Sequence, residues 1–172
     1  MTYFNKFPLY QYDIEDNQYR TLITDIVRRV NLKSNAKANT LVFDNYNVKD
    51  GEQPDTVADK YYGDSGLHWI IVTVNNITSR YDWPLDQVAL SQFVNDKYSN
   101  PNGTHHHEIN ATSGDTTKKL TVSSDTDGAT AITNYEYEEK EQDKRRQIRL
   151  LDPKFIDRFI SEFNTLMNES VI

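Results

Sequence analysis

The amino-acid sequence predicts an α+β fold, because strand-like runs and amphipathic helical stripes occupy separate stretches of the 172-residue chain. The clearest helical stripe lies at 155–167, where large apolar residues recur at helical spacing. The stretch 46–77 has the order strand, glycine turn, helix, glycine break and second helix. The stretch 104–134 is rich in Thr, Ser, Asp and Gly, which favours short strands joined by turns. A small mixed core with an inserted β-hairpin is therefore expected.

The helices of the stretch 46–77 have recognisable ends. Pro54 suits the first turn of a helix, because its missing N–H has no intrahelical partner there. Gly63 is expected to end that helix in the left-handed conformation that glycine adopts at little cost. A second apolar helix from Leu67 to Val74 closes at a turn-forming pair of asparagines.

The first twenty residues alternate aromatic and polar side chains. Pro8 forces Phe7 towards extended geometry, so we expect an extended N-terminal arm. Its rings either insert into neighbouring chains or pack back on the core of this chain, and both alternatives stay open. A short helix is expected from Thr24 to Val30, followed by a polar linker at 31–39.

Turn and capping signals predict the elements beyond residue 77. An Asp152-Pro153 pair is expected to begin the last helix, as N-cap and first helical residue. The other expected elements are a helix at 84–98, strands at 105–110, 118–123, 130–134 and 148–151, and a charged helix at 135–146.

The composition points to a protein that is completed by other chains. Only 37% of the residues are hydrophobic and the mean hydropathy is −0.76, which is lean for a free-standing globule. A net charge of −7 argues against a broad phosphate-binding face, which needs clustered Lys and Arg. No stretch is apolar enough for a membrane helix, and the N-terminus lacks the pattern of a secretion signal. The absence of cysteine leaves no disulfide or thiol chemistry.

His105, His106, His107 and Glu108 form the most metal-like cluster. On a regular strand, His105 and His107 would face one side and His106 the other, so only two of the three could share an ion. We interpret them as polar residues of an exposed hairpin and expect no metal site. A metal-dependent hydrolase using this cluster is kept as a third, weaker hypothesis.

Other chemical motifs are missing from the sequence. Asp125, Asp127 and Gly128 are interpreted as a turn, because Ala129 stands where a calcium loop needs a ligand. No nucleophile elbow and no phosphate-binding glycine loop occurs. We therefore predict no enzymatic activity, no catalytic residues and no cofactor.

The central stretch resembles a LysM module, the βααβ fold known for binding N-acetylglucosamine polymers. The run Gly51-Glu52-Gln53-Pro54 departs from the usual Gly-Asp-Thr-Leu, and no closing strand is visible directly after Ile77. The matching features are the Tyr46-x-Val48-x-x-Gly51 turn, the Val57-Ala58 pair, Tyr62-Gly63 and Asn75-Asn76-Ile77.

Further motifs follow one another along nearly the whole chain: Phe7-Pro8, Thr24-Asp25-Ile26, Leu67-His68-Trp69-Ile70-Ile71, Trp83-Pro84, Lys97-Tyr98, Asn134-Tyr135-Glu136-Tyr137-Glu138, Lys144-Arg145-Arg146-Gln147-Ile148 and the closing Phe-rich helix. Their order resembles the baseplate wedge protein 53 family of T4-type contractile-tailed phages. The resemblance implies a non-enzymatic structural protein of the virion, located in the tail baseplate and assembled in the host cytoplasm. It implies contacts with core-bundle wedge proteins, the sheath-initiator protein and neighbouring wedges, and no nucleic-acid or membrane partner.

We accordingly divide the chain into an N-terminal arm and short helix at 1–40, a LysM-like module plus following helix at 41–100, a β-hairpin insertion at 101–134 and a C-terminal helical segment at 135–172. Wedge assembly is the favoured function, and LysM-type binding of peptidoglycan for cell-wall attachment or lysis is the alternative. Interface cores favour Tyr, Trp and Phe. The residues expected to form the protein interface are Tyr3, Phe4, Phe7, Tyr10, Gly51, Tyr62, Trp69, Asn75, Asn76, Trp83, Phe159 and Phe163.

Overall fold

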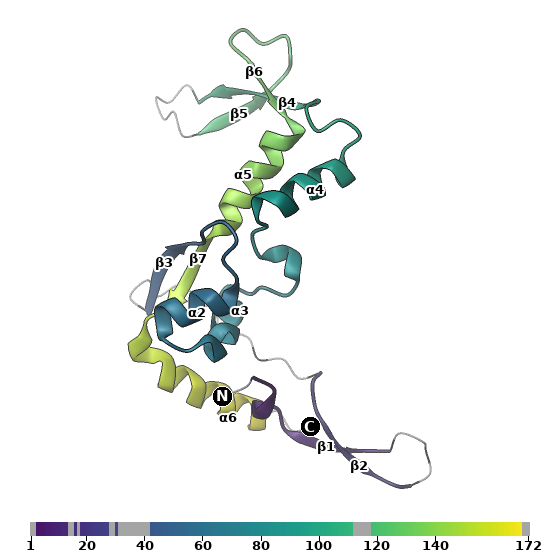
Figure 1. Cartoon of the computed structure of the whole chain (residues 1–172), viewed down its shortest axis with the longest axis vertical. Helices are drawn as coiled ribbons and strands as arrows, with labels where there is room; N and C mark the ends of the chain where they lie inside the picture. Colours follow the sequence, from purple (N-terminus) through teal and green to yellow (C-terminus); the bar gives the residue numbers. More distant parts are fainter. Residues whose placement is uncertain are drawn as a thin grey trace. The chain divides into compact units, whose positions relative to one another are not determined.

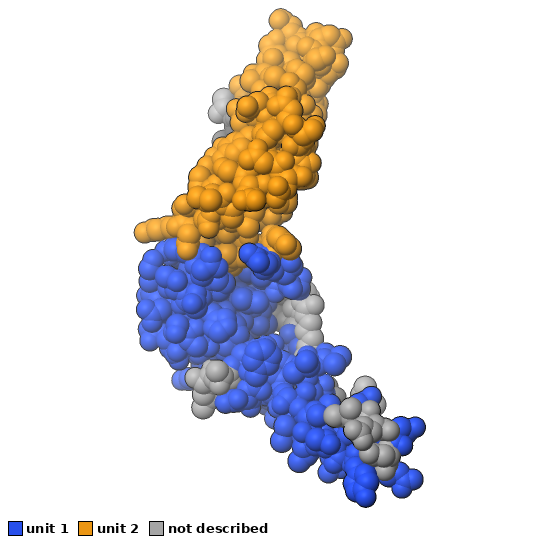
Figure 2. Space-filling view, turned by 45° about the vertical axis from the view of Figure 1, so that its right-hand side comes forward, with its two compact units in different colours: residues 1–47, 52–80, 148–172 blue, residues 48–51, 81–147 orange. Residues whose placement is uncertain are grey.

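The computed structural model divides the chain into two compact units (Figure 2). Its mixed helices and strands confirm the predicted α+β class. Unit 1 comprises residues 1–47, 52–80 and 148–172, and unit 2 comprises residues 48–51 and 81–147. The structure describes residues 3–13, 16, 18–27, 30, 42–111 and 118–169.

Unit 1 is built on the order strand, helix, helix, strand: β3 (Phe43–Asn47), α2 (Pro54–Tyr62), α3 (His68–Val74) and β7 (Gln147–Leu151). The closing strand, which the sequence does not show after Ile77, comes from a segment more distant in the chain (Figure 1). The Val48 N–H donates to the Arg146 carbonyl and the Asp152 N–H donates to the Val42 carbonyl, both at 2.9 Å. Each bond joins the end of one strand to the beginning of the other, so β3 and β7 run antiparallel.

The predicted helix ends are confirmed in unit 1. Pro54 is the first residue of α2, and Gly63 ends α2 with φ 74°, its N–H donating to the Asp59 carbonyl. A 3-10 turn, η3 (Ser65–Leu67), leads into α3. Asn76 follows α3 at φ 54°, a left-handed conformation that asparagine tolerates better than most residues.

The last helix covers the core of unit 1. A 3-10 turn, η5 (Pro153–Phe155), begins where the Asp152 side chain accepts a hydrogen bond from the Lys154 N–H, as its N-cap position predicts. Helix α6 (Ile156–Glu169) continues from it and buries Phe163 and Met167. These side chains complete a core cluster with residues from the N-terminal segment, α3 and β7, namely Phe7, Trp69, Ile70, Val74 and Leu151.

The N-terminal segment folds into a 3-10 turn, η1 (Tyr3–Lys6), and a hairpin of β1 (Leu9–Tyr12) and β2 (Thr21–Thr24). The single extended arm and the helix predicted from Thr24 are therefore wrong within the described residues. Thr24 instead pairs with Leu9, and a turn follows at 26–27. Cross-strand pairing of β-branched and aromatic residues favours the strand over the helix. The predicted linker at 31–39 lies outside the described residues.

Unit 2 combines two helices with a three-stranded antiparallel sheet of order β5–β4–β6. The three strands match the sequence prediction for this stretch, and the sheet lies at the beginning of α5 (Figure 1). Helix α4 begins after Asp86, whose side chain accepts from the Ala89 N–H, and not at Pro84. The elements are η4 (Arg80–Asp82), whose first residue belongs to unit 1, α4 (Gln87–Lys97), β4 (Thr104–Asn110), β5 (Lys119–Val122), β6 (Thr130–Thr133) and α5 (Asn134–Arg146).

Candidate protein-interaction surface

Five of the aromatic residues predicted for the interface form one cluster inside unit 1. The ring centroids of Trp69 lie 4.7 Å from Phe163, 5.8 Å from Phe159 and 5.5 Å from Tyr3. Tyr3 also meets Phe7 edge to face at 4.9 Å. Of the two alternatives for the N-terminal aromatic residues, the rings of Tyr3 and Phe7 therefore pack on the core of this chain. They fasten the base of the N-terminal hairpin to α3 and α6.

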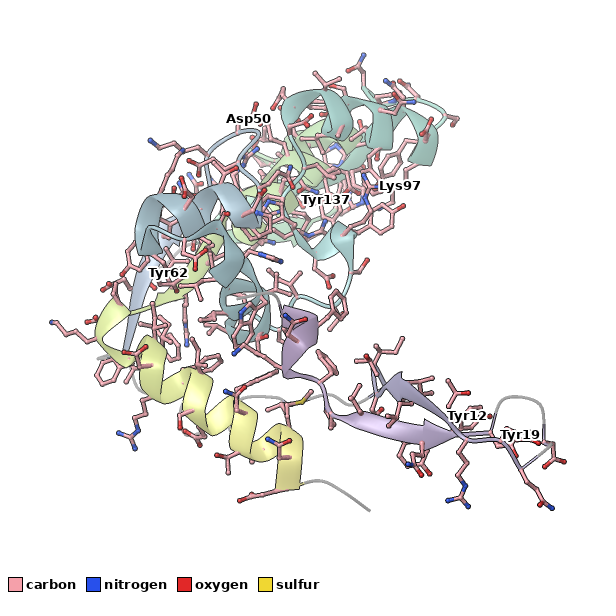
Figure 3. The ribbon with its side chains drawn as sticks, turned by 60° about the horizontal axis from the view of Figure 1, so that its bottom comes forward. Tyr12, Tyr19, Asp50, Tyr62, Lys97 and Tyr137 are labelled. Carbon is pink, nitrogen blue, oxygen red and sulfur yellow. The ribbon has the colours of Figure 1, made fainter. Side chains whose placement is uncertain are left out.

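Other side chains of the N-terminal segment are exposed. Phe4 is 63% exposed, Tyr10 58% and Tyr19 80%. Figure 3 shows Tyr12 and Tyr19 on the hairpin. The strands carry no charged residue, so the hairpin presents apolar side chains to solvent. Leu9, Tyr12 and Leu22 are also exposed, although the sequence analysis did not select them. The alternation of Leu9, Tyr10 and Tyr12 with polar residues was the signal available for them.

A groove of about 350 Å³, with both apolar and polar residues in its lining, lies beside the base of the hairpin. One side is formed by Phe4, Phe7 and the segment after β2, where Val27 is 90% exposed. The other side is formed by α3 and the residues that follow it, among them Val72 and Ile77. Among the described residues, no charged residue lines the groove. We call the exposed hairpin and this groove together the N-terminal surface.

Two predicted interface residues of unit 1 bind its own backbone. The Asn75 side chain accepts from the Arg149 N–H and donates to the Arg149 carbonyl, both at 2.8 Å. The Tyr62 hydroxyl accepts from the Leu151 N–H at 3.0 Å. Burial raises the pKa of Tyr62 to about 12, despite the opposing effect of that hydrogen bond. Both side chains hold β7 to the helices.

The remaining predicted residues are scattered. Asn76 is exposed at the end of α3, and Gly51 is exposed with φ 74°. Trp83 is buried. Gly51 and Trp83 belong to unit 2, whereas the other ten predicted residues belong to unit 1. The prediction that all twelve form a protein interface stays a prediction.

The loop between β3 and α2 is engaged inside unit 2. The Arg146 guanidinium donates to the Val48 carbonyl at 3.4 Å and to the Leu85 carbonyl at 3.3 Å, and it pairs with Asp50 at 3.4 Å. Asp50 also accepts from the Gln87 N–H at 3.1 Å. The Val48 carbonyl and the Asp50 carboxylate of this loop are thus engaged inside unit 2.

Unit 1 has a separate, partly buried ion pair next to this loop. Glu52 is buried and accepts hydrogen bonds from the Tyr46 hydroxyl at 2.9 Å and the Lys60 ammonium at 2.5 Å. Burial, reinforced by the Glu52 carboxylate, raises the pKa of Tyr46. A glutamate at this position therefore serves as a structural anchor between β3 and α2.

The histidines of β4 do not alternate as predicted. A bulge at His105 shifts the register between β4 and β6, so that His105 and His106 approach each other, with 2.8 Å between their Nδ1 atoms. The expectation that His105 and His107 share a side is wrong, because a bulge places two residues opposite one. No group of three or more His, Asp or Glu side chains suited to a metal ion occurs within the part of the chain that the structure describes.

A family model described as base plate wedge protein 53 matches residues 1–127 of the chain. The chain belongs to this family. None of the curated proteins matches it. Because it belongs to the base plate wedge protein 53 family, the protein is a structural component of a phage tail baseplate, and its place is the tail of the virion. Among the described residues, no helix has the length and apolar character needed to cross a membrane.

The family match covers the N-terminal surface, β3, α2, α3 and the first two strands of the unit 2 sheet. It ends before β6, α5, β7 and α6, although β7 and α6 complete the core of unit 1. The sequence resemblance at 134–148 and in the closing helix lies beyond the match and stays a prediction.

Proposed function

We propose that this wedge protein binds neighbouring wedge proteins through its N-terminal surface and helps to join wedges into the baseplate ring. The observation that carries the proposal is the exposed apolar side chains on β1 and β2, two strands without charged residues, beside a groove of unit 1 that no charged residue lines among the described residues. The proposed partners are core-bundle wedge proteins, the sheath-initiator protein and adjacent wedges. No nucleic acid and no membrane is proposed.

The hairpin is poorly suited to exist alone. A two-stranded hairpin is marginally stable in water, and among the described residues β1 and β2 pair only with each other. Their outer edges present backbone groups ready for another strand. Their exposed side chains, such as Leu9 and Leu22, would gain about 25 cal/mol for each Å² of apolar surface removed from water. A protein partner would supply both kinds of contact.

The hairpin is also held where a partner could use it. Tyr3 and Phe7 anchor η1 to Trp69 and Phe163, and the Asp25 N–H donates to the Pro8 carbonyl at 2.9 Å across the hairpin base. A fixed base reduces the conformational entropy that binding must overcome. The buried aromatic residues would thus support the interface without touching the partner.

We further propose that β3, α2, α3 and β7 form a LysM-like scaffold whose second strand is donated by the C-terminal segment. Support comes from the βααβ order and the antiparallel pairing of β3 with β7. Sugar binding is not part of the proposal, because the polar groups of the Gly51 loop and Asn75 are occupied by internal hydrogen bonds. Pull-down of the full chain on insoluble peptidoglycan tests this, and saturable binding would contradict it. A 40–80 fragment would lack β7.

Wedge assembly with the other wedge proteins of the same phage tests the main proposal. The variant combines Tyr10→Ser and Leu22→Ser, which remove exposed apolar groups from both strands. Loss of an interface hot spot costs about 2 kcal/mol or more, so affinity should fall roughly 30-fold. Sedimentation of assembled wedges and rings measures the effect.

The matched control is Val88→Ser, which removes a still more exposed apolar group from α4. It should assemble like the unchanged protein. Thermal unfolding of both variants checks that the core of unit 1 is intact. Normal ring formation by the folded hairpin variant would refute a role of the N-terminal surface in joining wedges.

A further inference from the structure

A pair of histidines in unit 2 joins the three-stranded sheet to α5. The Nδ1 atoms of His105 and His106 lie 2.8 Å apart, and their rings are nearly perpendicular at 82°. The His105 ring stacks on Tyr137 of α5, with centroids 3.9 Å apart and planes within 8°. The bulge in β4 brings these rings together.

The neighbours of His106 determine where its proton lies. His106 Nε2 is 2.9 Å from Glu108 Oε1, and an ionised carboxylate can only accept a hydrogen bond. Nε2 therefore carries the proton, and in the neutral ring Nδ1 keeps its lone pair. The other Glu108 oxygen accepts from the Lys140 ammonium at 2.8 Å. The hydrogen bond from Lys140, aided by His106 and opposed by burial, holds the pKa of Glu108 below its usual range.

The short contact then assigns the tautomer of His105. Because His106 Nδ1 must accept, His105 Nδ1 must carry a proton and donate it. Neutral His105 is therefore left with its lone pair on Nε2. The two rings differ in tautomer, and each tautomer is imposed by a named partner.

The other ionisable groups around the pair come from α4, α5 and β4. From α4 and its cap, Lys97 and Tyr98 approach, and the Tyr98 ring is 6.4 Å from His105. Both donate to Glu138 of α5, at 2.6 Å from Lys97 and 2.7 Å from Tyr98. The groups of α5 nearest the pair are Tyr137 and Lys140, and Glu141 and Lys144 form an ion pair one turn further on. Strand β4 contributes Glu108 on the same face as His106 and His107 on the opposite face.

We propose that His105 and His106 form a proton-sensitive contact that tolerates one added proton and opens on the second. The first proton, taken from solvent, binds His105 Nε2 and leaves the Nδ1–H donor in place. The resulting cation lies over the Tyr137 ring, which favours it. A second proton can bind His106 only at Nδ1, where it would face the His105 N–H. The hydrogen bond between the two rings is then lost.

Histidine side chains change protonation between about pH 5 and 8, so the change can be followed near neutral pH. NMR of the full chain, with correlations between ring nitrogens and carbon-bound ring protons, tests the assignment. At pH 8, His105 should appear as the Nδ1–H tautomer and His106 as the Nε2–H tautomer. On acidification, the two rings should take up their protons in two separate steps, as expected for coupled groups. The ring shifts of Tyr137 should change with the first uptake, because His105 stacks on that ring.

Two substitutions sharpen the test. In His105→Asn, the amide nitrogen replaces the Nδ1 donor, and the amide can rotate to offer its oxygen when His106 is protonated. His106 should then titrate in one step, without coupling. His107→Asn, on the opposite face of β4, should keep both steps of the pair. An Nε2–H tautomer of His105 at pH 8 in the unchanged protein, or simultaneous titration of both rings, would overturn the proposal. Saturable Zn²⁺ binding that is lost in His105→Asn would also overturn it, in favour of a metal site.

Discussion

Asn75 binds both backbone polar groups of Arg149: its Oδ1 accepts from the N–H and its Nδ2 donates to the carbonyl, each at 2.8 Å. The same amide nitrogen donates to the Ile71 carbonyl at 2.9 Å, near the end of α3. One side chain thus satisfies the end of a helix and the edge of β7. It replaces the backbone partners that a further strand would offer.

Asn75→Ala should destabilise unit 1. Removing the amide leaves the Arg149 backbone groups without this partner, and an unsatisfied polar group costs about 1–3 kcal/mol when buried. Because Arg149 is partly solvated, we expect a loss of stability in the lower half of that range. Urea denaturation measures the change in the free energy of unfolding. Thr56→Ala, on the exposed face of α2, is the control and should change the free energy of unfolding by less than about 0.5 kcal/mol.

Phe163→Ala should cost more than any hairpin substitution. Phe163 is 3% exposed and contacts Trp69 and Tyr3 in the core of unit 1. Truncating a buried phenylalanine costs about 3–5 kcal/mol, a large part of the roughly 5–15 kcal/mol of a typical domain. The double variant with Phe159→Ala should fail to fold, and therefore fail to join wedges. Val88→Ala in α4 is the exposed control. Cooperative unfolding of the double variant near the unchanged midpoint would contradict this expectation.

Glu138 should make unit 2 sensitive to acid. Burial acts to raise the pKa of Glu138, but hydrogen bonds from Lys97 and Tyr98 outweigh it, so the pKa lies below its usual range. A carboxylate with a lowered folded-state pKa adds stability above its unfolded pKa, and this is lost as pH falls through the folded value. Denaturation at pH 7, 5 and 3 should show this loss as the solution becomes acidic.

The matching variant is Glu138→Gln. Hydrogen bonds to charged groups contribute about 1.5–3 kcal/mol, so this variant should be less stable than the unchanged protein at pH 7. The difference should shrink as the pH falls through the lowered folded-state pKa of Glu138, because the carboxylate then takes up a proton. Glu139→Gln, exposed on the same helix, should show no such convergence. A difference that is constant across the three pH values would exclude the carboxylate as its source.

Gly63→Ala should destabilise the end of α2. Gly63 has φ 74°, and the left-handed conformation costs a residue with a Cβ about 1–2 kcal/mol. The added Cβ itself meets no atom within 4 Å, so backbone strain alone is tested. Gly63→Asn should lose less stability than Gly63→Ala, since asparagine tolerates this region better. Equal unfolding midpoints for the two variants would contradict the conformational explanation.

Local signals predicted much of the fold. The proline and glycine at the ends of α2, the Asp152 cap and the apolar stripe of α6 act within one or two turns of chain. The helix predicted after residue 20 was wrong for the same reason, because it rested on local signals alone. Thr24 looked like a helix cap, but its partner on β1 lies fifteen residues earlier. Pairing across a loop overrides a weak local preference.

The candidate interface was only partly predictable. The sequence marked the N-terminal aromatics as important, but it could not divide them into anchors such as Phe7 and exposed groups such as Tyr10. That division depends on which rings reach Trp69 and α6. The groove is likewise formed by segments from three parts of the chain.

By itself, the sequence determined the fold class, the ends of the central helices, the three strands of the insertion and the family. Tertiary structure alone decided that β7 closes the βααβ core, that the arm is a hairpin and that a bulge unites His105 with His106. The physical reason is range: caps and periodicity act between near neighbours. Strand register and burial depend on hydrogen bonds and packing between segments more than a hundred residues apart.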